Sequence, residues 1–163
     1  MDRRQLLAGA AAALGPWRRA RATVHEESWR DPRRERELPL RLRWPDGQAP
    51  CALVVHSHGL GGNRNGGDVW GEAWQRAGFA VLHLQHPGSD TEVLRRGMPA
   101  LRGAANAEQL RERIADMQFV VDEISRRARQ REPGWSRVRL DALGSTALMA
   151  PAGLGPGDRW RQD

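Results

Sequence analysis

The sequence predicts an α/β protein with a mostly parallel sheet flanked by helices. Two short, unbroken apolar runs, 51–55 and 79–84, have the character of central strands that are buried on both faces. A helical segment that begins near Asp68 separates them, and a longer amphipathic helix follows from Asn106. A strand, a helix and a second strand joined by short links form a parallel crossover unit.

Residues 38–44, which precede this unit, alternate strictly between apolar and polar side chains. A period of two predicts a half-buried strand. Residues 23–37 are polar and charged, and we expect them to form a solvated lead-in. The folded domain is therefore predicted to begin at Leu38.

The middle of the chain contains two predicted helices and a long connection. Asp68 is placed to cap the first helix, in which Trp70 and Trp74 lie four residues apart on one face. We expect residues 85–105 to form a long loop at the end of the second strand. Asn106 then starts the strongest helix, with Gln109 placed for a reciprocal cap.

That last helix carries an apolar stripe with a period of 3.6 residues. Its members are Leu110, Ile114, Met117, Val121, Ile124 and Ala128. Residues 138–144 begin like another strand and complete the predicted domain, 38–144. Residues 145–163 are rich in Gly, Pro and Ala, and we expect them to be an atypical, disordered tail.

Composition limits the classes of protein that this chain can represent. Its 163 residues fit one domain, and a mean hydropathy of −0.68 excludes a multi-spanning membrane protein. The lone cysteine, Cys51, excludes a disulfide framework within the chain. The net charge is +6, but residues 1–22 carry +4 of it, so the body is only mildly basic. We therefore expect no nucleic-acid partner.

Residues 1–22 have the features of an export signal of the twin-arginine type. Arg3 and Arg4 stand just before an apolar run, 6–14, that is too short to span a bilayer as a stable helix. Small residues at 20 and 22 suit a signal peptidase, so the mature chain would start at Thr23. The expected location is the periplasm or the outside of the cell, without a stable membrane span.

A glycine-rich turn, His58-Gly59-Leu60-Gly61, follows the first buried strand. Glycines at this place free backbone amides to point above the sheet, where they can hold an oxyanion. The sequence here resembles the α/β-hydrolase family, in particular the dienelactone hydrolase and platelet-activating-factor acetylhydrolase branch. The resemblance is carried by residues 54–62 (VVHSHGLGG), 77–81 (AGFAV), 86–90 (HPGSD) and the stretch from the 106 helix to 138–141 (VRLD).

The resemblance covers roughly residues 38–144 and implies roles for the turn. Leu60 would donate its backbone N–H to the oxyanion, Gly59 and Gly61 would shape the turn, and His58 would support the loop. A full-length relative would hydrolyse a small ester or lactone through an acylated serine, without cofactor or metal. The alternative is that the turn merely joins a strand to a helix.

The sequence departs from the family after Gly144. The family pattern continues into Gly-His-Ser-x-Gly, the turn that exposes the nucleophile, but this chain has STALMAP at 145–151 and no Gly-x-Ser-x-Gly anywhere. The 19 residues after Gly144 leave no room for the later strands, the acid and the catalytic histidine. We expect a partial α/β-hydrolase fold, lacking the later strands, that is inactive as written. A frameshift, a truncated gene or a mis-assigned end would explain the change in character; a genuinely short relative is the other possibility.

A sheet without its later strands has an exposed apolar edge, so we expect self-association through that edge.

Four other side chains are candidate nucleophiles. Ser57 lies between two histidines and Ser89 precedes Asp90, and either would need a base such as His83 or His86 within about 2.6–3.2 Å. Ser145 lacks the second glycine of the nucleophile turn, and Cys51 is expected in the core.

Two rival functions remain open. Four histidines, His56, His58, His83 and His86, end neighbouring predicted strands and could gather around a metal, although no carboxylate follows at close spacing. The third interpretation is a non-catalytic, exported binding module, in which tryptophans and arginines form a surface for anions or carbohydrate. The tryptophans concerned are Trp29, Trp44, Trp70, Trp74, Trp135 and Trp160.

Overall fold

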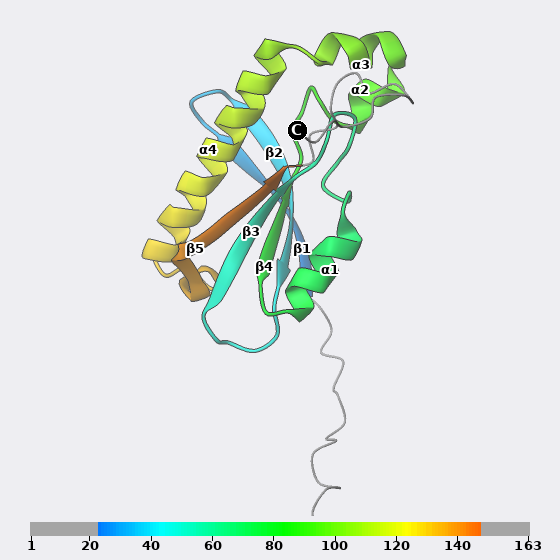
Figure 1. The fold of residues 1–163 in the computed structure, drawn as a ribbon. Coiled ribbons are helices and arrows are strands. Elements are labelled where there is room, and N and C mark those ends of the chain that lie inside the picture. The colour runs from blue at the N-terminus through cyan, green and yellow to red at the C-terminus, as the bar shows by residue number, and fades with distance from the viewer. Residues whose placement is uncertain (1–22, 148–163) are drawn as a thin grey trace, which may run out of the picture.

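The chain folds into a five-stranded sheet that lies between one long helix and a shorter one (Figure 1). This arrangement is that of a computed structural model, which describes residues 23–147. The strands are β1 (Thr23–Asp31), β2 (Arg36–Trp44), β3 (Cys51–Ser57), β4 (Ala80–Leu84) and β5 (Val138–Ala147). The helices are α1 (Asp68–Arg76), α2 (Thr91–Arg95), α3 (Met98–Ala104) and α4 (Ala107–Arg129), with a 3-10 turn, η1 (Trp135–Arg137), before β5.

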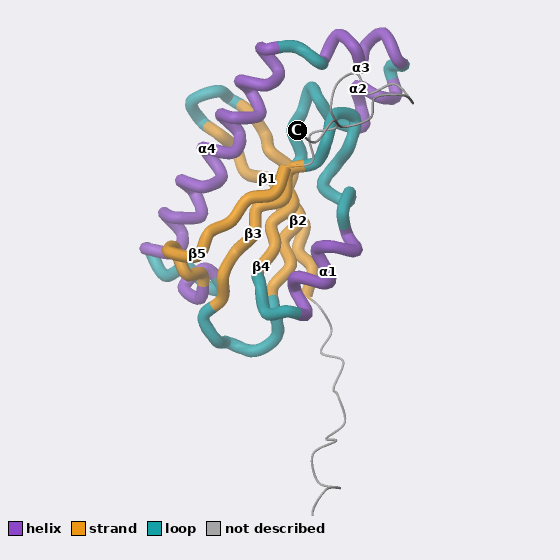
Figure 2. The backbone as a smooth tube through the Cα atoms, viewed as in Figure 1, coloured by secondary structure: helices purple, strands orange, loops and turns teal. Residues whose placement is uncertain are grey.

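The strands lie in the order β1-β2-β4-β3-β5. β3 runs parallel to both β4 and β5, whereas β2 runs antiparallel to both β1 and β4. The predicted crossover from β3 through α1 to β4 is therefore confirmed. The predicted α/β class is confirmed as well, as a mixed sheet flanked by helices (Figure 2).

Alternation along the strands gives the sheet two different faces. The face toward α4 is apolar and contains most of the core, with Leu40, Leu53 and Leu82 all at most 1% exposed. On that side, Val120 and Ile124 of α4 are completely buried against the sheet. The face toward α1 also carries buried polar side chains, among them His56, His83 and Arg43.

The N-cap of helix α1 lies one residue earlier than expected. Gly67 occupies the N-cap position with φ +79°, and Asp68 is the first helical residue. The Asp68 carboxylate instead accepts hydrogen bonds from Arg41 and Arg43 of β2, both at 2.9 Å. The prediction that Asp68 caps the helix is therefore wrong, because its side chain pairs with two arginines under the helix.

The long loop predicted over residues 85–105 contains two short helices, α2 and α3. Asp90 caps α2 by accepting a hydrogen bond from the Glu92 N–H at 3.2 Å. Gly97 is the N-cap of α3, and Pro99 stands in its first turn, where a missing N–H costs nothing. The prediction of a long loop is therefore corrected to a connection that contains two short helices, of five and seven residues, at the carboxyl end of β4.

Helix α4 starts as predicted but is rotated about its axis relative to the expected stripe. The Asn106 side chain accepts a hydrogen bond from the Gln109 N–H at 2.9 Å, so the cap by Asn106 is confirmed. The reciprocal half of the predicted cap is wrong, because the Gln109 side chain makes no hydrogen bond to the Asn106 N–H and its Oε1 is buried without a partner among the described residues. The buried face is formed by Asp116, Val120 and Ile124, not by the whole predicted stripe. Asp116 faces inward because it binds two arginines and a histidine, and this contact sets the rotation of the helix.

The two ends of the described chain also differ from expectation. The solvated lead-in predicted for residues 23–37 contains β1, which pairs with β2 along its whole length from Thr23 to Asp31. Its polar side chains hid this strand, because β1 lies at the sheet edge with only Trp29 and Asp31 buried. β5 continues three residues past Gly144, to Ala147. The predicted signal segment, 1–22, and residues 148–163 of the predicted tail lie outside the described residues.

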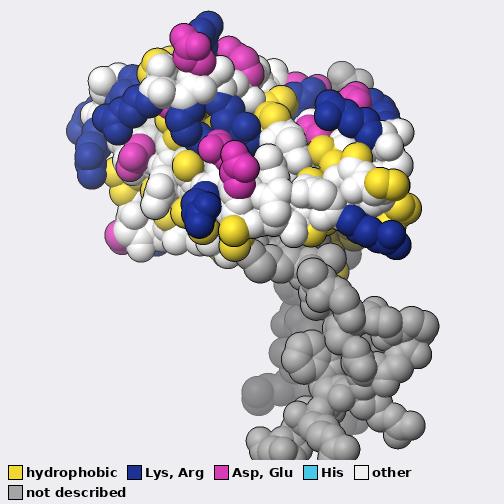
Figure 3. Space-filling model, turned by 90° about the horizontal axis from the view of Figure 1, so that it is seen from above, with side chains coloured by type: hydrophobic (Ala, Val, Ile, Leu, Met, Phe, Trp, Pro, Cys, Tyr) yellow, Lys and Arg dark blue, Asp and Glu magenta, His cyan; other side chains and the backbone are white. Residues whose placement is uncertain are grey.

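The surface at the end of the sheet beyond β3 and β4 carries charges of both signs. Figure 3 shows basic and acidic side chains interspersed on this face, with apolar patches between them. Within residues 23–147, none of the helices combines the length and the apolar character that a membrane crossing needs.

Candidate oxyanion site and the network beneath it

The glycine-rich turn lies directly after β3, at the carboxyl end of the parallel strands. His58, its first residue, is buried, whereas Leu60 at its tip is 37% exposed. Gly61 adopts φ +79°, a left-handed conformation that glycine adopts at low cost. The turn therefore presents backbone at the end of a buried strand, as the sequence predicted.

The His58 ring holds the turn from below. Its Nε2 accepts a hydrogen bond from the His86 N–H at 3.0 Å, so the ring proton is on Nδ1, which donates to the Gly59 carbonyl at 2.6 Å. Burial lowers the pKa of His58 to about 4. A neutral imidazole with both nitrogens occupied supports the backbone and has no free nitrogen for base catalysis.

Backbone contacts fix the other side of the turn. The Gly61 N–H donates to the Ser89 carbonyl at 2.8 Å, and the Thr91 hydroxyl donates to the Gly62 carbonyl at 3.0 Å. An isolated bridge pairs Gly62 with Asp90. The segment 86–91 after β4 thus holds the turn in place.

The N–H groups of Gly59 and Leu60 differ from those of Gly61 and Gly62, which donate to the Ser89 and Gly59 carbonyls. Neither the Gly59 N–H nor the Leu60 N–H forms a hydrogen bond with any residue in the range 23–147. A donor that stays unpaired while the backbone around it is fixed is suited to bind a developing negative charge without reorganisation. This is the geometric feature that the proposed oxyanion role requires.

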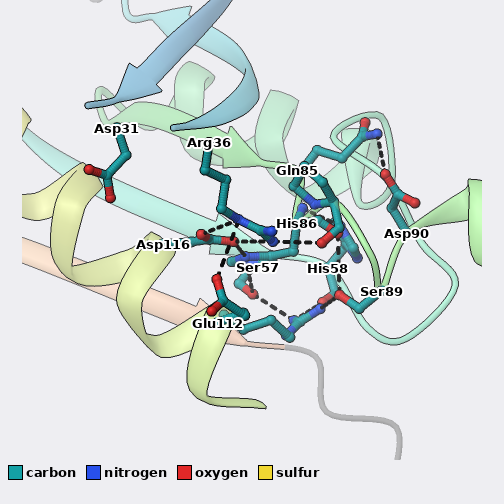
Figure 4. A network of polar contacts seen from close by, with 12 residues as sticks. Asp31, Arg36, Ser57, His58, Gln85, His86, Ser89, Asp90, Glu112 and Asp116 are labelled. Carbon is teal, nitrogen blue, oxygen red and sulfur yellow. Dashed lines mark hydrogen bonds and ion pairs between the residues drawn. The ribbon is translucent and has the colours of Figure 1, made fainter. Parts of the chain in front are cut away.

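A buried chain of polar side chains runs beneath the turn (Figure 4). Ser57 Oγ lies 2.9 Å from His86 Nε2, and His86 Nδ1 lies 2.9 Å from Asp116 Oδ2. All three side chains are at most 4% exposed. With the proton on Nδ1, His86 donates to Asp116 and accepts from the Ser57 hydroxyl, which is the connectivity of a Ser-His-Asp triad.

Asp116 is held as a carboxylate by positive partners. Arg34 Nη1 and Arg36 Nε each donate to its Oδ1 at 2.8 Å. Burial on its own would raise the pKa of Asp116, but hydrogen bonds from His86 and the two arginines outweigh this and lower the pKa. Burial lowers the pKa of His86 despite its contact with Asp116. The pair is therefore an ionised aspartate and a neutral histidine.

Arg113 of α4 joins this network to the turn. Its guanidinium donates to Ser57 Oγ at 2.9 Å, to Ser89 Oγ at 3.0 Å and to the His58 carbonyl. A planar guanidinium can serve three acceptors in fixed directions, which an ammonium cannot. Arg113 thus links α4 to both segments that form the site.

The structure brings together only some of the residues singled out in the sequence. Ser57 and His86 are in contact, and Ser89 lies beside them through Arg113. His83 lies on the other face of the sheet, Ser145 is exposed on β5, and Cys51 is buried in the core. Burial raises the pKa of the Cys51 thiol, as expected for a core residue.

Sequence reasoning missed Asp116, Arg113, Arg34 and Arg36. Each lies in a charged or amphipathic segment where a solvated role is the ordinary expectation. The one available signal was the position of Asp116 between apolar residues of the predicted helix. That signal competed with the apolar stripe, which favoured a different rotation of α4.

The four histidines form two separate pairs, not one cluster. His56 and His83 face each other at 5.0 Å between ring centroids on the α1 face, and His58 and His86 lie 5.4 Å apart at the strand ends. Within residues 23–147, no group of three or more His, Cys, Asp or Glu side chains is placed to hold a metal ion. The arrangement gives the metal interpretation no geometric support in this part of the chain.

Comparison with known proteins identifies the architecture. No family model and no curated protein matches the sequence. Among solved structures, the fold is similar to dienelactone hydrolase from Anabaena variabilis, with a TM-score of 0.55 and 19% identity over 78% of this chain and 52% of that chain. It is also similar to 2,6-dihydroxy-pseudo-oxynicotine hydrolase, with a TM-score of 0.52 and 17% identity over 77% of this chain and 30% of that chain.

This chain has part of the α/β-hydrolase fold. The partial resemblance predicted from the sequence is thereby confirmed at the level of the fold. The chain spans about half of the dienelactone hydrolase and about a third of the oxynicotine hydrolase.

Proposed function

We propose that this chain carries the oxyanion-binding part of a serine ester or lactone hydrolase and that, as written, it does not hydrolyse esters itself. The observation that carries the proposal is the Leu60 N–H, unpaired among the described residues in a turn fixed by His58, Ser89 and Arg113. The similarity in fold to two hydrolases supports the same chemistry. The missing Gly-x-Ser-x-Gly pattern supports the lack of turnover.

Ser57 is the one serine with triad connectivity, and its surroundings argue against a nucleophilic role. Its side chain is 4% exposed, so a substrate carbonyl has no approach to Oγ. Arg113 donates to one lone pair of Oγ, which withdraws electron density from the oxygen. We therefore assign the Ser57–His86–Asp116 chain to the support of the turn.

Two assays of the purified chain test these statements. Incubation with a fluorophosphonate probe and with a short-chain p-nitrophenyl ester should give neither labelling nor turnover above a Leu60→Pro control, which lacks the proposed donor. Labelling that disappears in Ser57→Ala would overturn the assignment of Ser57. Turnover above the control would overturn the proposed inactivity.

The oxyanion role needs a positive test of its own. Titration with methylphosphonate, observed by amide NMR, should shift the Leu60 N–H selectively, because an anion in the turn becomes its acceptor. In Leu60→Pro the shifts of the neighbouring Gly61 and Gly62 amides should vanish. Shifts spread evenly over surface amides in both proteins would contradict the proposal.

Export is proposed from the first 22 residues alone. Their paired arginines and short apolar run support transport of the folded protein by a twin-arginine pathway. Fractionation of expressing cells should recover a chain starting at Thr23 outside the cytoplasm. Replacing both arginines (Arg3→Lys with Arg4→Lys) should retain the protein inside, and unchanged export of this variant would refute the pathway.

A hollow at the opposite end of the sheet supports a second candidate function, binding without catalysis. Its volume is about 620 Å³, and Trp44, Trp135 and Arg137 are among the residues that line it. Two indole rings and a guanidinium suit a sugar or a small carboxylate. Such ligands should quench tryptophan fluorescence in the parent and in Trp70→Ala but not in Trp44→Ala.

A further inference from the structure

Helix α4 carries an apolar stripe of three exposed residues in line with Met117, which itself also packs against the core. Leu110, Ile114 and Val121 are 42%, 50% and 37% exposed, and Met117 lies between them. Their spacings of four, three and four residues place them on one line along the helix. This spacing is typical of a helix that packs lengthwise against another helix.

The stripe is separate from the face of α4 that packs on the sheet. That face is centred on Asp116, Val120 and Ile124, all completely buried, and Met117 lies at the border between it and the stripe. Since successive residues are turned by about 100°, the stripe points roughly a quarter-turn or more away from the buried face. A hollow of about 490 Å³ lies on this side, lined by Met117, Gln118, Val121 and Asp122. α4 lies at the outside of the molecule along its whole length (Figure 1).

Two opposite charges border the stripe on the same side. Arg111 and Asp122 are both exposed, and neither forms an ion pair or hydrogen bond with any residue from 23 to 147. Their positions are 11 residues apart, about 16 Å along the helix, so they cannot pair with each other in one molecule. A basic group thus borders one end of the stripe and an acidic group borders the other.

We propose that this stripe binds the same stripe of a second copy of the chain, with the two α4 helices antiparallel about a two-fold axis. In this arrangement Leu110 of one copy faces Val121 of the other, and the two central residues, Ile114 and Met117, face each other in the same way. The symmetry places Arg111 of each copy beside Asp122 of the other, twice in the dimer. A parallel pair would instead place Arg111 beside Arg111.

The charge order is what favours a second copy over another partner. A surface with a positive end and a negative end is complementary to itself when one copy is reversed, and it needs no outside partner for balance. One pair of helices buries less than the roughly 1,600 Å² of a standard stable interface. The expected dimer is therefore weak, with a dissociation constant on the order of 10 μM.

Sedimentation velocity of the full chain over a wide concentration range tests the proposal. We expect a reversible monomer–dimer equilibrium that Ile114→Asp abolishes, since it introduces a charge at the centre of the stripe. Trp70→Ser is the matched control, because it removes an exposed apolar residue, 61% exposed, from α1. Circular dichroism of each variant ensures that the comparison is between folded proteins.

A charge exchange identifies the arrangement of the two helices. Arg111→Asp alone and Asp122→Arg alone should each weaken the dimer roughly tenfold, because each creates two repulsive pairs. The double variant, with both charges exchanged, should restore the parent constant within about threefold. A chain that is monomeric throughout overturns the proposal. So does a dimer that ignores these substitutions, as association through the edge of β5 would, or a double variant without recovery.

Discussion

The two histidine pairs occupy neighbouring strands of one sheet but are held in different ways. In the pair His58–His86 both nitrogens of each ring have hydrogen-bond partners. In the pair His56–His83 each ring uses only Nδ1, and both Nε2 atoms are buried without a partner among the described residues. The ring separations are nearly equal, 5.4 Å and 5.0 Å. The two pairs therefore have similar ring separations but different hydrogen-bonding environments.

The difference shows what fixes each pair at the carboxyl end of β3 and β4. At the first pair, hydrogen bonds to Asp116 and to the turn determine position, and removal of one partner leaves others unpaired. At the second pair, contact with helix α1 determines position, because Gly67 and Gly71 let the helix backbone approach the rings. Loss of a polar partner should therefore lower the stability of the protein at the His58–His86 pair. At the His56–His83 pair, added side-chain volume should lower it.

The largest expected effect comes from the polar pair. Asp116→Ala removes the carboxylate that accepts from Arg34, Arg36 and His86, and leaves these donors in a buried environment. We expect a loss of about 4 kcal/mol in the free energy of unfolding at neutral pH, as for other broken buried ion pairs. Urea denaturation followed by circular dichroism measures it.

Asp46→Asn is the matched control for this substitution, since Asp46 is exposed and has no hydrogen bond or ion pair with the described residues. It should change the stability by less than about 0.5 kcal/mol. A loss below about 1 kcal/mol for Asp116→Ala would mean that the network does not hold α4 in its rotation.

The second effect addresses the packed pair. A Cβ on Gly71 would lie 2.4 Å from His83 Nε2, and the completely buried ring has little freedom to move. Gly71→Ala should therefore cost about 2 kcal/mol, because overpacking exceeds the gain in helix propensity. Gly103→Ala, in α3 with nothing within 4 Å of the new Cβ, should instead gain up to about 1 kcal/mol.

A double variant sharpens this prediction. His83→Ala makes room for the added methyl group, so Gly71→Ala should cost much less in the His83→Ala background than in the parent. Thermal unfolding of the four proteins gives the coupling energy directly. Equal costs in both backgrounds would show that the strain arises elsewhere, for example from the nearby Arg43 guanidinium.

One histidine of each pair, His58 and His83, should contribute equally to the pH dependence of stability. Burial lowers the pKa of both His58 and His83 to about 4, from an ordinary value near 6.5. The unfolded chain then binds protons that the folded chain does not, so stability is complete above pH 6.5 and falls progressively toward pH 4. Each of these histidines should account for about 2 kcal/mol lost between pH 7.5 and pH 5.

Denaturation at several pH values tests this sign and size. His58→Gln and His83→Gln should each reduce the slope of stability against pH by a similar amount, although only His58 has both nitrogens occupied. An unchanged slope for His83→Gln would mean that the ring takes up a proton in the folded state, for instance by drawing on the Asp68 carboxylate nearby.

The fold was predictable where apolar pattern decides structure. The runs at 51–55 and 79–84 gave β3 and β4, and the Asn106 cap gave the start of α4. β1 escaped prediction because an edge strand needs few apolar residues. Its charged side chains remain in water while its backbone pairs with β2.

The site was predictable only in its backbone part. Glycines after a buried strand predict a turn, and the structure has one there. The role of the Leu60 N–H rests on the resemblance to α/β hydrolases and stays a prediction. The supporting network was not predictable, because Asp116 and Arg113 of α4 lie more than 20 residues along the chain from the histidine and the serines that they contact. The sequence of the turn does not indicate these partners. Ion pairs between residues far apart in the chain leave no local sequence pattern. They also bury Asp116, so the face of α4 that packs on the sheet differs from the predicted apolar stripe.

The smallest effect on stability is expected at Arg113, and it separates support of the turn from support of the whole fold. Arg113→Met keeps the length of the side chain but removes donors to the His58 carbonyl, Ser57 and Ser89. The free energy of unfolding should fall by only about 1 kcal/mol, because each acceptor keeps another partner or gains water. The turn should loosen much more, with amide exchange at Gly61 about tenfold faster.

Two control variants separate these effects. Arg129→Met, at the exposed end of α4, should change neither the stability nor the exchange at Gly61. Arg113→Lys should not restore the slow exchange, because an ammonium cannot reproduce the planar guanidinium. Equal acceleration at Gly61 and throughout the core strands would instead assign Arg113 to global stability.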